Sequence, residues 1–233
     1  MTFAHIRAVL FDKDGTLFDF SASWSGWASR LLSDLSGGDA ATAERLATAI
    51  EYDLSESRFR PTSPVIAGTL AEATELLLPH LPEESFGSLS EHLLRSSAAA
   101  EMVPPLPLAP LLDRLTAHGL KLGVATNDGV ASAIAHLTRA GILEHFTQVL
   151  GYDSGYTPKP APDMLLGFAT HLGLEPRHVV MVGDSTHDLV AGRAAGMATI
   201  GVLTGMASAA ELHPYADRVL LDIGHLPGAL GLV

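Results

Sequence analysis

The chain has 233 residues, of which 47% are hydrophobic and 17% charged, so it can bury a sizeable core and is not intrinsically disordered. Cysteine is absent, which excludes disulfides, thiolate metal sites and a cysteine nucleophile. With 14 basic residues and a net charge of −12, the chain is a poor partner for nucleic acid and for anionic membrane surfaces.

The N-terminal segment has no basic stretch followed by an apolar core and a cleavage site, so no signal peptide is readable. No run of roughly 18 or more apolar residues, the length that a membrane span needs, occurs in the chain. We therefore expect a cytoplasmic protein that is a monomer or a small homo-oligomer.

Short apolar segments alternate with helical patterns along most of the chain. Strands are predicted at residues 5–11, 120–125, 146–150, 179–182, 199–203 and 218–221. Helices are predicted at residues 108–117, 130–140, 162–172 and 189–195. Apolar strands separated by helices indicate an α/β fold, with a doubly wound, Rossmann-like parallel sheet covered on both faces.

One long segment interrupts this alternation and contains no convincing strand. Its alanine- and leucine-rich stretches predict helices at residues 24–35, 40–52, 69–80 and 88–100. We expect a core domain built from residues 1–20 and 104–233, with residues 21–103 inserted as an α-helical cap domain. The proline-rich stretch 102–110 suits a hinge between the two.

Polar side chains follow several of the predicted strands. Asp12 and Asp14 come directly after the first strand, and their spacing puts both carboxylates on one side of an extended chain. Gly15 next to them permits a sharp turn and close approach of a ligand. One carboxylate can act as a nucleophile and the other as an acid and base, although Asp and Gly are also ordinary turn residues.

The later strand ends add a phosphate-binding pattern and a metal-binding pattern. Thr126 and Asn127 precede a predicted helix, where they can bind an anion or simply cap the helix. Lys159 lies between two prolines, where it can neutralise a phosphoryl group as a point charge or remain a solvated side chain. Asp184 and Asp188 lie one helical turn apart after a buried strand. Acidic groups converging with Asp12 would repel one another without a cation, and their hard oxygens favour Mg²⁺.

This order of motifs resembles the haloacid dehalogenase-like phosphohydrolases. D-x-D-G-T, a threonine at a strand end, a lysine and G-D-x-x-x-D occur at residues 12–16, 126, 159 and 183–188. The motifs F-D-x-D-G-T-L-x-D, T-P-K-P-x-P and G-D-S-x-x-D look like the phosphoglycolate phosphatase-like branch, which carries its mobile cap where residues 21–103 fall. Lys13 departs from the pattern, which usually has an apolar residue there.

The resemblance implies a role for each matched residue. Asp12 would become phosphorylated, Asp14 would act as general acid and base, and Thr126 and Lys159 would assist catalysis by binding phosphoryl oxygens. Substrate binding would also involve a further set, namely Gly15, Thr16 and Asn127. Mg²⁺ would be held by Asp12, the backbone carbonyl of Asp14 and Asp184, with Asp188 orienting the ligands of the metal site.

The implied activity is hydrolysis of a small phosphorylated metabolite, with 2-phosphoglycolate as the best guess. A sugar-phosphate mutase, which uses the same core chemistry, and a non-catalytic phosphate-binding or signalling module remain alternatives. Cap residues should select the substrate: Arg58 or Arg60 could clamp a substrate carboxylate, whereas Trp24 and Trp27 are expected to pack inside the cap.

Overall fold

The computed structural model describes residues 3–232 and confirms the parallel sheet. Six strands lie in the order β5-β4-β1-β6-β7-β8, and every neighbouring pair is parallel. Their bounds are Ala8–Phe11 (β1), Lys121–Ala125 (β4), Phe146–Leu150 (β5), Val179–Gly183 (β6), Ala198–Val202 (β7) and Arg218–Leu220 (β8). The sheet therefore aligns the carboxyl ends of β1, β4 and β6 at one edge, where the predicted site residues follow.

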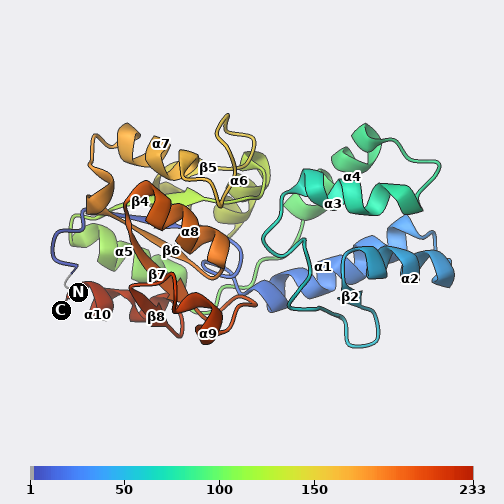
Figure 1. Cartoon of the computed structure of the whole chain (residues 1–233), viewed down its shortest axis with the longest axis horizontal. Coiled ribbons are helices and arrows are strands. Elements are labelled where there is room, and N and C mark those ends of the chain that lie inside the picture. Colours follow the sequence, from blue (N-terminus) through green and yellow to red (C-terminus); the bar gives the residue numbers. More distant parts are fainter. Residues whose placement is uncertain (1–2, 233) are drawn as a thin grey trace.

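Helices cover both faces of this sheet (Figure 1). Val9 and Phe11 of β1 pack in one hydrophobic cluster, and Ala8 and Leu10 pack in a second, as alternation along a strand requires. The first cluster includes α5 (Leu108–Ala117), α6 (Val130–Arg139) and α10 (Leu226–Leu230), and the second includes α7 (Asp163–His171) and α8 (Thr186–Ala195). The doubly wound architecture is thus confirmed.

The remaining core elements are short. They are α9 (Ala209–Leu212) and the 3₁₀ turns η2 (Leu143–His145), η3 (Pro176–His178) and η4 (Ile223–His225). Helix α8 starts at Thr186, where the pattern predicted residue 189, because Ser185 and Asp188 form a reciprocal capping box. No helix among residues 3–232 combines the length and hydropathy needed to cross a bilayer.

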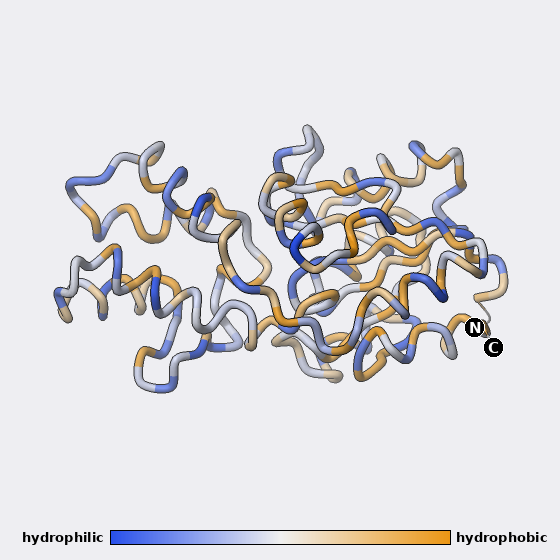
Figure 2. The backbone as a smooth tube through the Cα atoms, turned by 180° about the vertical axis from the view of Figure 1, so that it is seen from behind, coloured by the Kyte–Doolittle hydropathy of each residue, from blue (hydrophilic) through white to orange (hydrophobic). Residues whose placement is uncertain are grey.

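Residues between β1 and α5 form a separate lobe with its own hydrophobic cluster, drawn on the right in Figure 1. It contains α1 (Phe20–Leu35), α2 (Ala40–Ala49), α3 (Leu70–Leu77), η1 (Leu78–His80) and α4 (Phe86–Ala98). Figure 2 shows the two lobes from behind, with hydrophobic and hydrophilic stretches alternating along the cap helices. This alternation is typical of amphipathic helices that bury one face.

The cap also contains a small hairpin, which corrects the expectation of a purely helical insertion. Strands β2 (Tyr52–Asp53) and β3 (Arg58–Phe59) pair antiparallel where a helix was predicted to run to residue 52. Glu51 adopts a φ of 50°, which ends the helical course of the chain. The Tyr52 and Phe59 rings then pack edge to face, with centroids 5.0 Å apart.

The two chain segments that connect the lobes lie side by side. The Asp19 backbone N–H donates to the Val103 carbonyl at 2.9 Å, and the Val103 N–H donates to the Ser23 hydroxyl at 3.0 Å. The chain therefore passes between the lobes in two adjacent segments that are hydrogen-bonded to each other. The exact division at residues 20/21 and 103/104, and the hinge role of residues 102–110, stay predictions.

Close packing between β4 and α7 can be tested at Gly123. A methyl group at this position would collide with the ring of Phe168, which is fully buried. We expect Gly123→Ala to destabilise the protein by about 1–3 kcal/mol in chemical denaturation. Gly87→Ala is the matched control, since nothing lies within 4 Å of its added methyl group. Equal denaturation midpoints for the two variants would contradict this packing.

Candidate active site

Asp12 and Lys159 form the centre of the site. Asp12 follows β1 directly, and its backbone N–H donates to the Val182 carbonyl at 2.8 Å, which continues the pairing with β6. Both side chains are buried, and the Lys159 ammonium donates to Asp12 Oδ1 at 2.6 Å and to Asp188 Oδ1 at 2.5 Å. The structure thus brings together residues that lie 147 positions apart in the chain.

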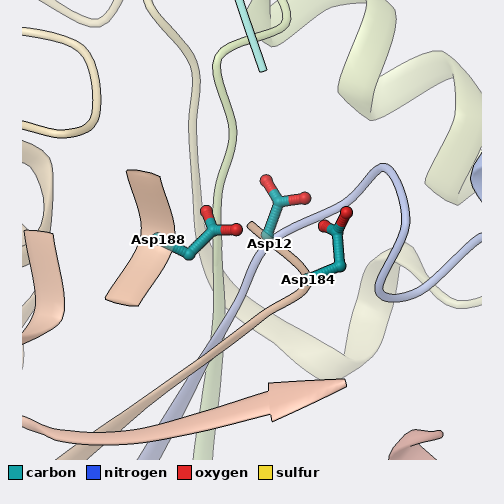
Figure 3. A group of neighbouring side chains, drawn as sticks. All are labelled: Asp12, Asp184 and Asp188. Atoms are coloured by element: carbon teal, nitrogen blue, oxygen red, sulfur yellow. The ribbon is translucent and has the colours of Figure 1, made fainter. Parts of the chain in front are cut away.

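Three carboxylates converge at this point. Asp12, Asp184 and Asp188 each offer one oxygen to a group whose members all lie within 4.8 Å of one another. Figure 3 shows their carboxylates directed toward a common space above the strand ends, with Asp12 between the other two. The arrangement matches the predicted acidic cluster, and its oxygens are the donor set that suits Mg²⁺.

Burial makes these charges costly. Burial raises the pKa of Asp12 from 3.8 to about 7, although the Lys159 charge opposes that shift. Burial, followed by repulsion from Asp188, raises the pKa of Asp184 well above its usual range. Burial alone would lower the pKa of Lys159, but the Asp12 and Asp188 carboxylates outweigh it and raise that pKa. A divalent cation here would relieve the remaining repulsion.

Small residues enclose Asp184. Gly15 has a φ of +81°, and a methyl group on it or on Gly205 would collide with the Asp184 carboxylate. The Thr16 hydroxyl donates to Asp184 Oδ1 at 3.4 Å, and the Thr204 hydroxyl donates to the Gly15 carbonyl at 2.6 Å. The turn predicted after β1 therefore folds against Asp184, which still offers one oxygen to the group of carboxylates.

Thr126 and Asn127 lie at the end of β4 and line the same cavity as Lys159. The Asn127 amide donates to the Lys159 carbonyl and to the Ala67 carbonyl of the cap, both at 2.9 Å, and its oxygen accepts from the Lys159 N–H at 3.0 Å. Asn127 therefore fixes the loop that carries Lys159 and bridges the core to the cap. Sequence reasoning missed this bridge; direct substrate binding by Asn127 stays a prediction.

Asp14 lines the cavity, but its side chain lies outside the three-carboxylate group. Its Oδ1 accepts from the Lys13 ammonium at 2.6 Å and from the indole N–H of Trp24 at 2.9 Å. Trp24 belongs to α1 of the cap and packs in the cap's hydrophobic cluster, as expected. It also lines the cavity and contacts Asp14. The Asp14 carboxylate is thus positioned jointly by the core and the cap.

Lys13 is fully buried and holds a second charged cluster together. Besides Asp14, its ammonium contacts Asp128 Oδ2 at 3.2 Å and His136 Nδ1 at 3.2 Å. Burial and then the Lys13 charge lower the pKa of His136, so its ring is neutral, accepts at Nδ1 and donates from Nε2 to the Ser97 carbonyl of α4 at 2.9 Å. The only feature of the sequence that could have indicated this cluster is Lys13 itself, a charged residue inside the D-x-D motif.

The cavity between the lobes has a volume of about 120 Å³. The core contributes the carboxylates, Lys159 and His187, whereas the cap contributes a mainly apolar wall. We call this surface the cap wall; its larger members are Phe20, Trp24, Trp27, Phe59, Ile66 and Leu93. Neither of the proposed carboxylate clamps lines the cavity: Arg58 is exposed and pairs with Glu56, and Arg60 is also exposed.

Removal of the Lys13 charge tests the second cluster. Lys13→Met would leave Asp14 and Asp128 facing each other without a cation, so we expect a loss of about 3–5 kcal/mol in the free energy of unfolding. Lys121→Met, at an exposed position of β4, is the matched control and should be nearly neutral. Combining Lys13→Met with Asp128→Asn should recover part of the loss; strict additivity would contradict the contact.

Comparisons with known proteins identify the family of this chain. A family model described as haloacid dehalogenase-like hydrolase matches residues 6–196. The chain is 29% identical to phosphoglycolate phosphatase from Escherichia coli (strain K12), over 99% of this chain and 94% of that protein. It is 42% identical to the probable phosphatase IndB from Dickeya dadantii (strain 3937) over 108 residues, which are 46% of this chain and 47% of that protein.

A solved structure shares the fold. The crystal structure of a predicted phosphoglycolate phosphatase from Haemophilus somnus 129PT has a TM-score of 0.72 and 21% identity, covering 96% of this chain and 97% of that one. The residues matched by the family model include every predicted site residue from Asp12 to Asp188. The chain therefore belongs to the haloacid dehalogenase-like hydrolases, and its resemblance to their phosphoglycolate phosphatase-like branch is confirmed.

Proposed function

We propose that this protein is a Mg²⁺-dependent phosphatase that hydrolyses a small phosphate monoester through an aspartyl-phosphate intermediate. Its class, a phosphoric monoester hydrolase, follows from the family and from its phosphatase relatives. The observation that carries the proposal is the buried Asp12 carboxylate, which lies on the cavity beside Lys159 and among further acidic groups. We also propose a cytoplasmic location and a small phosphorylated metabolite as the partner.

Two displacements at phosphorus make up the proposed reaction. An Asp12 oxygen attacks phosphorus, the bond to the ester oxygen breaks, and the departing alkoxide takes a proton from Asp14. Water then attacks the aspartyl-phosphate, gives a proton to Asp14, and releases inorganic phosphate together with the free Asp12 carboxylate. Asp14 Oδ1 accepts from Lys13 and Trp24, while Oδ2 has no hydrogen-bond partner among residues 3–232 and is the oxygen available for proton transfer.

Lys159 and a bound Mg²⁺ together would supply the positive charge that a phosphoryl dianion needs at the floor of the cavity. Lys159 and Thr126 would contact its oxygens. The backbone N–H of Gly15 donates to the Phe18 carbonyl at 2.7 Å and that of Thr16 to the Lys13 carbonyl at 3.4 Å, so the predicted substrate contacts through these two groups are not carried into the proposal. Bound Mg²⁺ supplies charge neutralisation for the phosphoryl group, and Asp12, Asp184 and the Asp14 carbonyl would hold it. These residues fit a cation because their carboxylates are buried, close together and only partly neutralised by Lys159.

Asp188 has a different role in this proposal. Its Oδ1 accepts from Lys159 at 2.5 Å, and its Oδ2 accepts from the Ser185 hydroxyl at 2.7 Å and backbone N–H at 3.0 Å. Both oxygens are therefore engaged by the protein. We infer that Asp188 fixes Lys159 and orients the metal site without needing to bind the metal directly.

The cavity favours hydrolysis over the alternatives. A mutase must bind a second phosphate of its sugar bisphosphate. Within residues 3–232, the part of the cap that lines the cavity contains no charged residue that could pair with this phosphate. A binding or signalling module would not require the complete set of Asp12, Asp14, Lys159 and Asp184. The relatives named phosphoglycolate phosphatase make 2-phosphoglycolate the first reference substrate to assay.

Asp12→Asn should abolish turnover, because an amide cannot act as the nucleophile, while leaving the fold intact. Release of phosphate from p-nitrophenyl phosphate in the presence of Mg²⁺ measures this loss, expected to exceed about 10³-fold. Asp34→Asn, at an exposed position of α1, is the matched control and should keep full activity. Chiral phosphate substrates should give retention of configuration; inversion would show direct attack by water and refute the aspartyl-phosphate.

Mg²⁺ should stabilise the protein more at pH 8 than at pH 5. The pKa of Asp12 rises from 3.8 in the unfolded chain to about 7 in the metal-free fold, so its contribution to stability is full below pH 3.8 and is lost as the pH rises through 7. A cation replaces the missing proton at high pH. At about 100 times its Kd, Mg²⁺ should raise the Tm at pH 8 by about 5–10 °C.

Asp184→Asn is the control for this metal effect, and EDTA provides the metal-free reference. The variant should lose most of the Mg²⁺-induced rise in Tm, since Asp184 supplies one of the clustered oxygens. An equal rise at both pH values, or an undiminished rise in Asp184→Asn, would contradict binding of Mg²⁺ at this cluster.

A further inference from the structure

We propose that the alcohol released by this enzyme is uncharged and largely apolar, in contrast to glycolate. This inference rests on the proposed phosphatase function and specifies the substrate class of the same site. It comes from the chemical division of the cavity, whose core side is strongly charged and whose cap side is apolar.

The cap wall lies opposite the place where the phosphoryl group would bind. Asp12 and Lys159 occupy the core side, so the ester oxygen and the alcohol must extend toward the cap. Asp14, the proposed proton donor, already contacts Trp24 of the cap wall at 2.9 Å. A leaving group protonated by Asp14 therefore emerges next to aromatic side chains.

Ring-to-ring contacts hold this aromatic surface in place. Trp24 and Trp27 pack edge to face with centroids 5.0 Å apart, and Phe20 packs on Phe59 at 5.7 Å. The indole N–H of Trp27 donates to the Ser96 hydroxyl at 2.9 Å, and that of Trp24 is used by Asp14. Both indole donors are engaged, so the rings present mainly their apolar surfaces to a substrate.

No cation is placed to receive a second negative charge. Among residues 3–232, only Lys159 and His187 of those lining the cavity can carry positive charge, and both come from the core. Lys159 is already paired with two carboxylates. Glu72 and Glu75 line the adjacent opening and would repel an anion there. A substrate carboxylate against the cap wall would thus lose its water without gaining a partner.

The arginines of the cap do not change this conclusion, because all of them are exposed and none lines the cavity. Arg58 pairs with Glu56 beside the turn of the hairpin, and both Arg58 and Arg60 are exposed. Arg139 of α6 donates to the carbonyls of Ala98 and Ala100 at 2.8 and 2.7 Å, which ties it to the end of the cap.

A matched pair of esters tests the proposal directly. Isobutyl phosphate and 2-phosphoglycolate have leaving groups with the same number of non-hydrogen atoms, but only the second carries a carboxylate. With Mg²⁺ present, we expect kcat/KM for isobutyl phosphate to exceed that for 2-phosphoglycolate by at least about tenfold. A ratio at or below one overturns the apolar assignment.

Substitutions in the cap wall assign the preference to this surface. Ile66 lines the cavity and is only partly buried, so Ile66→Arg places a cation there without filling a tight core position. This variant should shift the ratio toward 2-phosphoglycolate by at least about tenfold, whereas Ile66→Met, the uncharged control, should change it by less than about threefold. An unchanged ratio in Ile66→Arg contradicts recognition by the cap wall.

Further outcomes separate this proposal from the proposed function. Arg58→Ala and Arg60→Ala should leave the ratio of the two kcat/KM values unchanged. If 2-phosphoglycolate is instead the preferred ester and either variant abolishes its hydrolysis, an arginine binds the substrate carboxylate and the apolar assignment is wrong. The phosphatase function would still stand in that case. If neither ester nor p-nitrophenyl phosphate releases phosphate with Mg²⁺, the proposed function fails, and the substrate class fails with it.

Discussion

The concentration of buried negative charge at the ends of β1 and β6 is the constraint on which the rest of the structure depends. Asp12, Asp184 and Asp188 lie close enough to repel one another, and Lys159 neutralises only part of their charge. A parallel sheet brings such residues together from distant parts of the chain because its strands end at one edge. Gly15 then lets the following turn approach closely enough to enclose Asp184.

A second buried cation links this charged centre to the cap. Lys13 joins Asp14 to Asp128 and His136, and His136 in turn donates to a carbonyl of α4. Asn127 makes a comparable connection between the Lys159 loop and the cap. An opening of the cap would therefore break hydrogen bonds that also position site residues. On the proposed function, the arrangement would couple access to the cavity with the placement of Asp14, the proposed proton donor.

The sheet and the acidic cluster were predictable because each depends on a local pattern. Apolar strands ending in Asp12, Thr126 and Asp184 identify both the fold and the edge that carries the site. The hairpin of β2 and β3 was not predictable, since strands of two residues leave no periodicity and form through packing of Tyr52 on Phe59. The Lys13 cluster was equally hidden, because its partners come from a distant loop and helix that only the folded chain brings together.

The separation of the cavity into a charged core side and an apolar cap wall has an evolutionary consequence. On the proposed function, bond cleavage depends on residues near the strand ends, whereas the choice of metabolite depends on side chains of an inserted segment that line the cavity. After gene duplication, a copy would be able to diverge by exchanging partly buried cap-wall residues such as Ile66 while its acidic centre stays intact. New specificities can therefore arise without an intermediate that has lost its chemistry.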